Sequence, residues 1–395
     1  MLEFNLLQKI EYLVKHNRVV LLRECHSKWQ EGLLEKLAAE RIVVNLAAPM
    51  LRERALWQPT EFLKQYDGKR LLLKNIQFAP KLLDVLCAEG SIYHCLAVMS
   101  QAYYIMEEYR ERTGLVIVDL PVSLKKAHLP FLPATEQIKA LPETSVGAQE
   151  VFTEIFNGSL LDEAVTLQDR EAFYGEYVQN FLQHDIKMAT PVSDEMKFYR
   201  FLCNVAANVG KVLNYALLGN AVDISSPTSK LWLSYLEGAG IITLLPAIED
   251  DSLKRVAKAP KIYFTDTGLA AYLLRLQNPL EIATSAFADG LFENWVVLRL
   301  RNGYLQNGVE VLLSYFKDSN AKEINLLLEY NGVLYPMDIR KDVEVSVKKQ
   351  QKKFRLVAAV EADGSKKIGN GCIISICREA KQLDENLWLV PVGAI

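Results

Sequence analysis

The first third of the chain alternates short, continuously apolar runs with helical patterns. The apolar runs occupy residues 19–22, 41–47, 69–76, 91–99 and 113–120. Strands that are apolar along their whole length, and not only at every second residue, are typical of parallel sheets covered by helices on both faces. The pattern therefore predicts a parallel α/β domain over residues 1–135.

Length and composition limit the classes of protein to which the chain can belong. Its 395 residues, 50% hydrophobic and 24% charged, suffice for roughly two to four globular domains. The formal net charge of -3 gives no overall attraction to nucleic acid or to an anionic membrane, so such contacts would be local. The N-terminal residues lack the regions of a signal peptide, and no apolar run approaches the ~20 residues of a membrane span. We therefore expect a cytoplasmic protein without a membrane partner.

The six cysteines form no CxxC pair and no metal-ligand grouping with the five histidines. We expect buried free thiols, as in a reducing cytosol, and no metal site.

Beyond residue 135 the pattern changes from strands to helices and then to a mixture of both. Residues 136–192 are predicted to form a helical connector. In residues 193–282, two helices followed by a β-hairpin predict a winged helix-turn-helix, and residues 283–395 predict a small α/β domain. The start and stop signals of the second helix are Ser225 or Ser226, Pro227, Gly238 and Gly240.

Two stretches carry a specific resemblance to a known family. KAPKIYFTDTGLAAYLL (258–274) is followed by DGLFENWVVLRL (289–300), and further matches lie at 41–63 and 75–86. On these residues the chain resembles the bacterial and archaeal AAA-like P-loop ATPases that carry a C-terminal winged helix and a restriction-endonuclease-like domain of unknown function. The resemblance covers nearly the full length. It implies a P-loop NTPase-like sheet core and a nuclease-like C-terminal domain.

In this family the loop after the first strand binds nucleotide phosphates through glycine backbone N–H groups, a lysine, and a Ser or Thr that holds Mg²⁺. Here residues 23–31 contain no glycine. Lys28 falls at the lysine position only if the loop is shifted by one residue. The next residue, where the family has Ser or Thr, is Trp29, and its side chain cannot ligate a metal. The competing interpretation of Lys28 is a solvated loop residue.

The family also places an Asp-Glu pair after an apolar strand, where Asp holds Mg²⁺ and Glu orients water. This chain has Lys74 and Asn75 at that point. Lys74 reverses the charge at the metal position, and Asn75 cannot act as a general base. We therefore expect no ATP or Mg²⁺ cofactor; the alternative is an ATPase that uses divergent residues.

Nuclease-like sites use carboxylates to hold a divalent ion and a lysine to position or activate water. At the positions that the resemblance assigns, Glu293 and Glu323 are retained, Asn325 replaces Asp, and Asp338 and Arg340 replace Glu and Lys. Asn is a weaker metal ligand than Asp, Asp is one methylene shorter than Glu, and Arg stays protonated near neutral pH. The resemblance implies that these side chains converge at one end of the sheet. We expect a pocket closed by a salt bridge there, without metal-dependent cleavage of DNA.

Two groups of basic residues are candidates for nucleic-acid binding. The candidates are Lys230 on the second helix of the winged helix, Lys254, Arg255 and Lys258 in its wing, and Lys348, Lys349, Lys352 and Lys353 on a later helix. Phosphate contacts normally require several such side chains, and a solvated helix face is the competing interpretation of the last group. Trp232 and Tyr235 are expected to face the core or a protein partner.

The phosphate-binding loop, the Lys74–Asn75 position and the nuclease-like site each lack charges or side-chain geometry that the family chemistry needs. Together they favour a catalytically degenerate protein that acts as a binding or regulatory module. Its partner is expected to be a protein, and DNA is a possible partner. A working ATPase with divergent motifs and a DNA-binding protein without turnover are the two alternatives.

Overall fold

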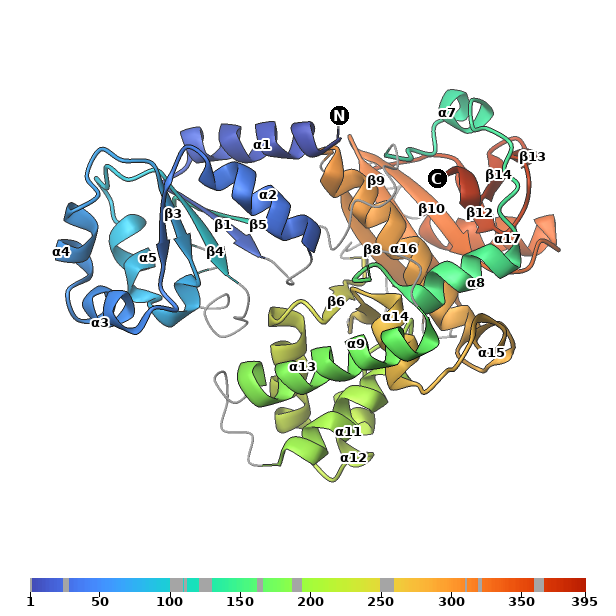
Figure 1. The fold of residues 1–395 in the computed structure, drawn as a ribbon. Helices are drawn as coiled ribbons and strands as arrows, with labels where there is room; N and C mark the ends of the chain where they lie inside the picture. The colour runs from blue at the N-terminus through green and yellow to red at the C-terminus, as the bar shows by residue number, and fades with distance from the viewer. Residues whose placement is uncertain are drawn as a thin grey trace.

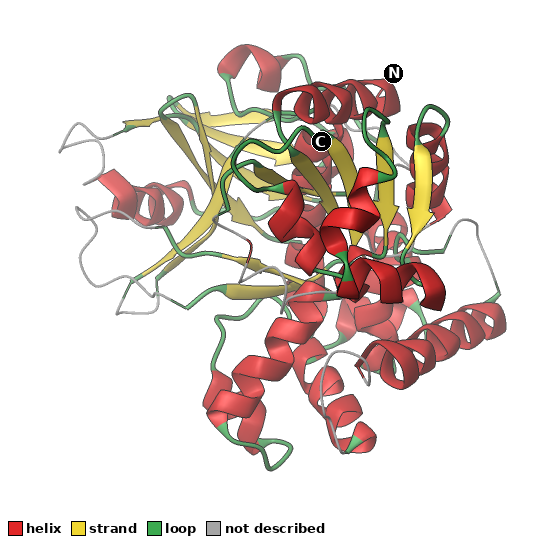
Figure 2. Ribbon diagram, turned by 90° about the vertical axis from the view of Figure 1, so that its left-hand side faces the viewer, coloured by secondary structure: helices red, strands yellow, loops and turns green. Residues whose placement is uncertain are grey.

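The computed structural model of the chain contains three groups of secondary-structure elements. Figure 1 shows the N-terminal sheet with its helices at the left, the C-terminal sheet at the right and most helices of the middle region below them. In Figure 2, seen from a direction at right angles to the first, helices again lie below the sheets. The structure describes residues 2–23, 28–99, 109, 112–120, 130–161, 166–186, 194–248, 259–309, 311–318, 322–358 and 366–395.

The N-terminal sheet consists of five parallel strands in the order β2-β3-β4-β1-β5. Its strands are β1 (Val19–Arg23), β2 (Ile42–Asn45), β3 (Leu71–Lys74), β4 (Cys95–Met99) and β5 (Leu115–Asp119). Its helices are α1 (Leu2–His16), α2 (Lys28–Ala38), α3 (Pro49–Trp57), α4 (Pro59–Lys64), η1 (Ile76–Phe78) and α5 (Lys81–Leu86). The predicted parallel α/β sheet is confirmed, and it is consistent with a P-loop NTPase-like core.

Helices cover both faces of this sheet. Val20 and Leu22 of β1 belong to a core formed with α1 and α2, whereas Val19 and Leu21 belong to a core formed with α3, α4 and α5. This double coverage explains why the strands are apolar along their whole length. Burial along the whole length, expected for all five strands, is absent at the two edges of the sheet: in β2 only Val44 is buried, and every residue of β5 is partly exposed.

The middle region is mainly helical, as predicted. Its elements are α7 (Thr135–Lys139), α8 (Ala148–Asn157), α9 (Leu167–Asn180), the π-helical turn η2 (Phe181–Ile186), α11 (Glu195–Ala206), α12 (Tyr215–Asn220), α13 (Ser226–Gly238), β6 (Ile242–Leu245), β7 (Lys261–Phe264), α14 (Thr267–Leu273) and α15 (Pro279–Thr284). The signals read for α13 are confirmed. The Ser225 hydroxyl accepts a hydrogen bond from Thr228 N at 3.2 Å, and Gly240 has a φ of 71° after the helix ends.

The C-terminal sheet is mixed, in the order β13-β14-β12-β10-β9-β8, with β11 beside β10. Its strands are β8 (Leu312–Lys317), β9 (Glu323–Tyr330), β10 (Val333–Ile339), β11 (Lys367–Ile368), β12 (Gly371–Ser375), β13 (Lys381–Asp384) and β14 (Leu387–Pro391). Its helices are α16 (Ala288–Gln306), α17 (Val347–Phe354), η3 (Arg355–Val357) and η4 (Val392–Ala394). The core on one face of the sheet includes α16, and the core on the other face includes α17.

The middle region and the C-terminal sheet share one hydrophobic core. The segment that follows β6 forms backbone hydrogen bonds with β8. Ile248 N donates to Tyr315 O at 2.8 Å, and Tyr315 N donates to Pro246 O at 2.9 Å. The domain boundaries at residues 136, 193 and 283 stay predictions from the sequence.

In the part of the chain that the structure describes, no helix combines the length and apolarity needed to cross a bilayer. Cys87, Cys95 and Cys372 are buried free thiols, and Cys203 and Cys377 are partly exposed ones. Burial raises the pKa of Cys95 and Cys372, so these two thiols remain protonated and unreactive at neutral pH.

Candidate functional site

A polar pocket of about 760 Å³ opens beside the C-terminal sheet. Four of the five residues expected at a nuclease-like site line it: Glu293 from α16, Asn325 from β9, Asp338 from β10 and Arg340 just beyond β10. The fifth, Glu323, lies at the start of β9 and is tied to the others through a shared lysine. The structure thus brings these five side chains together at one end of the sheet.

Asn325 makes its hydrogen bonds inside the pocket. Its Nδ2 donates to Glu293 Oε2 at 2.6 Å, and its Oδ1 accepts a hydrogen bond from Ile339 N at 3.2 Å. An Asp at this position would place a second carboxylate against Glu293, a contact that is unfavourable unless a cation lies between the two groups or one of them is protonated. The amide instead donates to Glu293, so the pair is stable without a metal.

The other oxygen of Glu293 accepts hydrogen bonds from Lys261 Nζ and, at 2.6 Å, from the Tyr263 hydroxyl. Lys261 also bonds Glu323 at 2.6 Å and is completely buried. We call Lys261, Glu293 and Glu323 the lysine–glutamate cluster. It joins β7 of the middle region to α16 and β9 of the C-terminal region.

The lysine–glutamate cluster shifts the pKa of each of its members. Burial raises the pKa of Glu293 in spite of the nearby Lys261 ammonium. At Glu323 burial acts in the same direction, but Lys261 and Lys317 outweigh it and lower the pKa. Burial would lower the pKa of Lys261, and the two carboxylates outweigh that effect and raise it. Lys261 and Glu323 therefore keep their charges, and Glu293 is the member that protonates first.

Asp338 is held by two cations. Arg340 bonds Asp338 Oδ2 through Nε at 3.0 Å and Nη2 at 2.6 Å, and Lys353 of α17 bonds Oδ1. The expected ion pair between Asp338 and Arg340 is present, but it does not close the pocket, which keeps its volume of about 760 Å³. Lys353 was interpreted as a nucleic-acid candidate, and the structure places it inside the pocket, whereas Lys348, Lys349 and Lys352 are exposed on α17.

The acidic side chains of the polar pocket that the resemblance relates to metal ligands are therefore engaged by protein donors. Across the described residues, no group of three or more His, Cys, Asp or Glu side chains has the arrangement of a metal site. A divalent ion at Glu293 or Asp338 would have to displace Lys261, Arg340 or Lys353. The donor set fits internal ion pairs and does not fit a metal centre.

At the nucleotide position, the residues between β1 and α2 lie outside the described chain, and Lys28 is the first residue of α2. Lys74 ends β3 and is half-buried. Asn75 follows with a left-handed φ of 60°, donates to Asn45 Oδ1 at 2.8 Å and accepts from Gln77 Nε2 at 3.2 Å. The carboxyl end of β3 is thus a neutral amide network with a lysine beside it.

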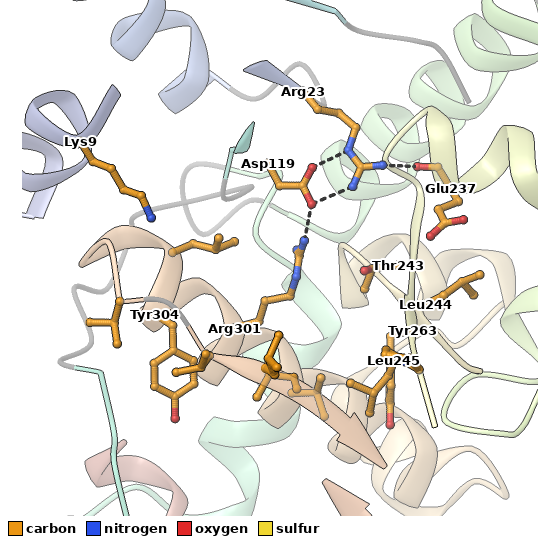
Figure 3. Close-up of a pocket in the computed structure, with 17 residues that line it drawn as sticks. Lys9, Arg23, Asp119, Glu237, Thr243, Leu244, Leu245, Tyr263, Arg301 and Tyr304 are labelled. Atoms are coloured by element: carbon orange, nitrogen blue, oxygen red, sulfur yellow. Dashed lines mark hydrogen bonds and ion pairs between the residues drawn. The ribbon is translucent and has the colours of Figure 1, made fainter. Parts of the chain in front are cut away.

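A second pocket lies between the carboxyl ends of β1 and β5, the β6–β7 pair and α16 (Figure 3). Asp119, at the end of β5, accepts hydrogen bonds from Arg23 Nε at 2.6 Å, Arg23 Nη2 at 2.7 Å and Arg301 Nη2 at 2.7 Å. We call these three residues the arginine–aspartate cluster. Burial acts to raise the pKa of Asp119, but the two guanidinium groups outweigh it and lower that pKa.

The remaining nucleic-acid candidates divide into two groups. Lys230 is exposed on α13, whereas Lys254, Arg255 and Lys258 lie outside the described residues. Trp232 on the same helix faces the core, with ring centroids 5.0 Å from Phe198 and 5.5 Å from Phe201. In the described part of the chain, α13 therefore offers one exposed lysine and an apolar inner face.

Two buried polar residues, one from each of the stretches that carried the family resemblance, hold several elements of the structure together. Asp266 is buried and accepts hydrogen bonds from Ser159 N, Leu160 N, Leu269 N and the Tyr174 hydroxyl. Asn294 is also buried, and its amide bonds both backbone groups of Phe264. These residues connect α8, α9, β7 and α16.

Sequence reasoning missed Arg23, Asp119, Lys261 and Arg301. A weak signal exists for two of them, since Arg23 and Asp119 each follow four apolar residues directly, at the carboxyl ends of adjacent parallel strands. Lys261 and Arg301 carry no local signal, because their partners come from distant parts of the chain.

Two parts of this chain match family models that are described as domains of unknown function. Residues 160–280 match the model of the Domain of unknown function (DUF8612), and residues 288–395 match that of the Domain of unknown function (DUF4143). The second match contains α16, the C-terminal sheet and all five predicted nuclease-like residues.

Two curated relatives are similar over part of their length. The uncharacterized proteins Rv2008c of Mycobacterium tuberculosis and Mb2031c of Mycobacterium bovis are each 23% identical over 185 residues, which is 47% of this chain and 41% of theirs. The chain thus spans less than half the length of these relatives. Among solved structures, the Walker-type ATPase paby2304 of Pyrococcus abyssi matches 68% of this chain and 94% of its own, with 12% identity and a TM-score of 0.38. The parallel sheet itself, and not this match, is the basis for comparing the core with P-loop NTPases.

Proposed function

We propose that the protein is a P-loop-ATPase-like protein that has lost nucleotide and metal chemistry and acts as a binding or regulatory module for a protein partner. In this proposal the middle region is a winged helix and the C-terminal region has a nuclease-like fold. The polar pocket carries the proposal. Its carboxylates Glu293 and Asp338 accept hydrogen bonds from Asn325, Lys261, Arg340 and Lys353, which engage the oxygens that a metal ion would need.

The N-terminal sheet supports the same conclusion. A magnesium ion at the end of β3 needs a carboxylate, and Lys74 and Asn75 offer an ammonium and an amide. Asn75 also uses its side chain in bonds to Asn45 and Gln77. We therefore expect calorimetric titration with millimolar ATP and Mg²⁺ to show no binding. Saturable binding in the micromolar range that Lys28→Ala abolishes would refute this expectation and favour the ATPase alternative.

The nuclease half of the proposal is tested with plasmid and single-stranded DNA in the presence of Mg²⁺ or Mn²⁺. The unmodified protein is expected to cut neither substrate. The double variant Asn325→Asp with Arg340→Lys restores one carboxylate and one lysine, and it should bind Mn²⁺ more tightly than the unmodified protein does. Cleavage by the unmodified protein that Glu323→Ala stops would refute the proposal.

DNA binding without turnover is the second candidate function. The observation in its favour is that Lys348, Lys349 and Lys352 are exposed together on α17, beside the polar pocket. Phosphate contacts release counterions, so the affinity for duplex DNA should fall steeply with salt. Reversing these three charges to Glu should weaken binding to all sequences alike, and Lys139→Glu on α7 is a matched exposed control. Absence of binding at low salt would leave the protein partner as the function to pursue.

A further inference from the structure

The second pocket has the size and the lining of a small-molecule site. Its volume is about 550 Å³, within the ~300–1,000 Å³ of typical ligand pockets. One wall is apolar and is formed by side chains of β6, α16 and β8, among them Leu244, Leu245, Val297, Leu312 and Leu313. Figure 3 shows Leu244 and Leu245 below and to the side of the arginine–aspartate cluster. The pocket also lies at the carboxyl ends of β1 and β5, the edge of a parallel sheet at which ligands generally bind.

The opposite end of the pocket is charged. Lys9, Arg23 and Arg301 contribute three positive charges and Asp119 and Glu237 two negative ones, which leaves one net positive charge. In Figure 3, Lys9 reaches toward the pocket from α1, and Arg301 rises from α16 toward Asp119. The pocket therefore matches a ligand with a single negative charge.

Arg301 has donors to spare for such a ligand. A guanidinium carries five N–H donors. Among the described residues, the protein bond of Arg301 is the one from Nη2 to Asp119 Oδ2. Its side chain is 24% exposed, so it is reachable from the pocket and partly shielded from water. A carboxylate can accept two parallel hydrogen bonds from one guanidinium, which makes this pair both strong and directional.

We propose that this pocket binds an aliphatic monocarboxylate, with its head group on Arg301 and its tail against the Leu244 and Val297 wall. A single negative charge complements the net positive charge of the pocket, whereas a phosphate monoester carries about two negative charges at neutral pH and complements it less well. The proposal concerns the junction of the N-terminal sheet and α16. It is independent of whether nucleotide and metal chemistry has been lost.

The test is calorimetric titration of the full chain with decanoate, at concentrations below those at which decanoate forms micelles. Three further probes separate the contributions: decanol has the tail without the charge, acetate has the charge without the tail, and decyl phosphate carries the additional charge. Decanoate is expected to bind at one saturable site, more tightly than each of the other three. Tightest binding of decyl phosphate would overturn the assignment to a carboxylate.

Two variants locate the site. Arg301→Met removes the head-group donor and should weaken decanoate binding about tenfold or more, since hydrogen bonds to charged groups contribute ~1.5–3 kcal/mol and each 1.4 kcal/mol is tenfold. Leu244→Trp fills the pocket from the apolar wall, leaves the arginine–aspartate cluster in place, and should also abolish binding. Arg54→Met, an exposed arginine on α3, is the matched control and should bind decanoate unchanged. No saturable binding of decanoate, or equal binding of decanol, or binding that neither pocket variant affects, would overturn the proposal.

Discussion

Two ionic clusters of opposite composition join the parts of this molecule. The arginine–aspartate cluster places one carboxylate between two guanidinium groups, where the N-terminal sheet meets α16. The lysine–glutamate cluster places one ammonium between two carboxylates, where the middle region meets the C-terminal sheet. The side chains of the first are 20–26% exposed, whereas Lys261 in the second is fully buried.

The difference in burial decides what each cluster does. Water screens the charges of the arginine–aspartate cluster, so its bonds contribute little to stability, and Arg301 keeps further donors for the proposed ligand. In the lysine–glutamate cluster, Glu323 is 23% exposed and also pairs with Lys317, whereas Lys261 is fully buried and Glu293 is 10% exposed. Removing Lys261 or Glu293 would therefore leave an uncompensated charge in a largely dry environment. We therefore expect the lysine–glutamate cluster to stabilise the fold and the arginine–aspartate cluster to take part in the proposed ligand binding.

The largest expected effect is that of Lys261→Met, which leaves Glu293 and Glu323 without their shared cation. We expect the free energy of unfolding, measured by urea denaturation, to fall by ~3–5 kcal/mol. Glu323 keeps Lys317 at 3.1 Å, so Glu293 is the carboxylate left without a cation; adding Glu293→Gln removes that charge and should recover part of this loss. A loss below about 1 kcal/mol in the single variant would show that the two clusters are equivalent.

Asn325→Asp should produce the next largest effect. It removes the hydrogen bond from Asn325 Nδ2 to Glu293 and brings two carboxylates into contact. We expect a loss of ~1–3 kcal/mol at neutral pH. Because the contact raises the pKa of one carboxyl above its unfolded value, the loss should shrink as the pH falls through that raised pKa. Asn325→Ala removes the donor without adding a charge, and equal losses in both variants at neutral pH would contradict the electrostatic cause.

Asp119→Asn tests the arginine–aspartate cluster and should cost about 1 kcal/mol at neutral pH. The pKa of Asp119 is lowered in the folded protein, so its contribution is present above the ordinary Asp pKa of ~3.9 and is lost as the pH falls through the folded value. The variant should therefore differ from the unmodified protein at pH 7 and match it in acid. A difference that persists below the folded pKa would point to packing and not to charge.

The alkaline end of the pH scale separates the two clusters further. The raised pKa of Lys261 means that its contribution is fully present below the ordinary Lys pKa of ~10.4 and is lost as the pH rises through the folded value. Lys261→Met should lack this alkaline loss, while Asp119→Asn should keep it. Denaturation curves of both variants from neutral to alkaline pH would measure the difference.

The smallest effect is expected for a fully solvated pair. Lys64 and Glu61 of α4 form an ion pair at 2.6 Å with side chains 57% and 63% exposed. Glu61→Gln should leave the urea midpoint unchanged within error, because water screens both charges. A clear shift would mean that exposure is not what distinguishes the clusters.

The sequence by itself determined the elements and much of their order. The continuously apolar runs predicted a parallel sheet covered on both faces, and the capping signals at Ser225 and Gly240 predicted the start and end of α13. These features are local, since burial and backbone geometry act on neighbouring residues. The family resemblance also indicated which polar residues of the C-terminal region would meet.

Only the tertiary structure decided which charges face each other. Arg23 and Arg301 lie 96 and 182 positions from Asp119 along the chain, and Lys261 lies 32 and 62 positions from its two glutamates. No periodicity links residues at such separations, so the sequence shows charged side chains without showing their partners. Contacts of α16 with α1 and with the C-terminal sheet bring them together, and the depth at which each cluster is buried then sets its role.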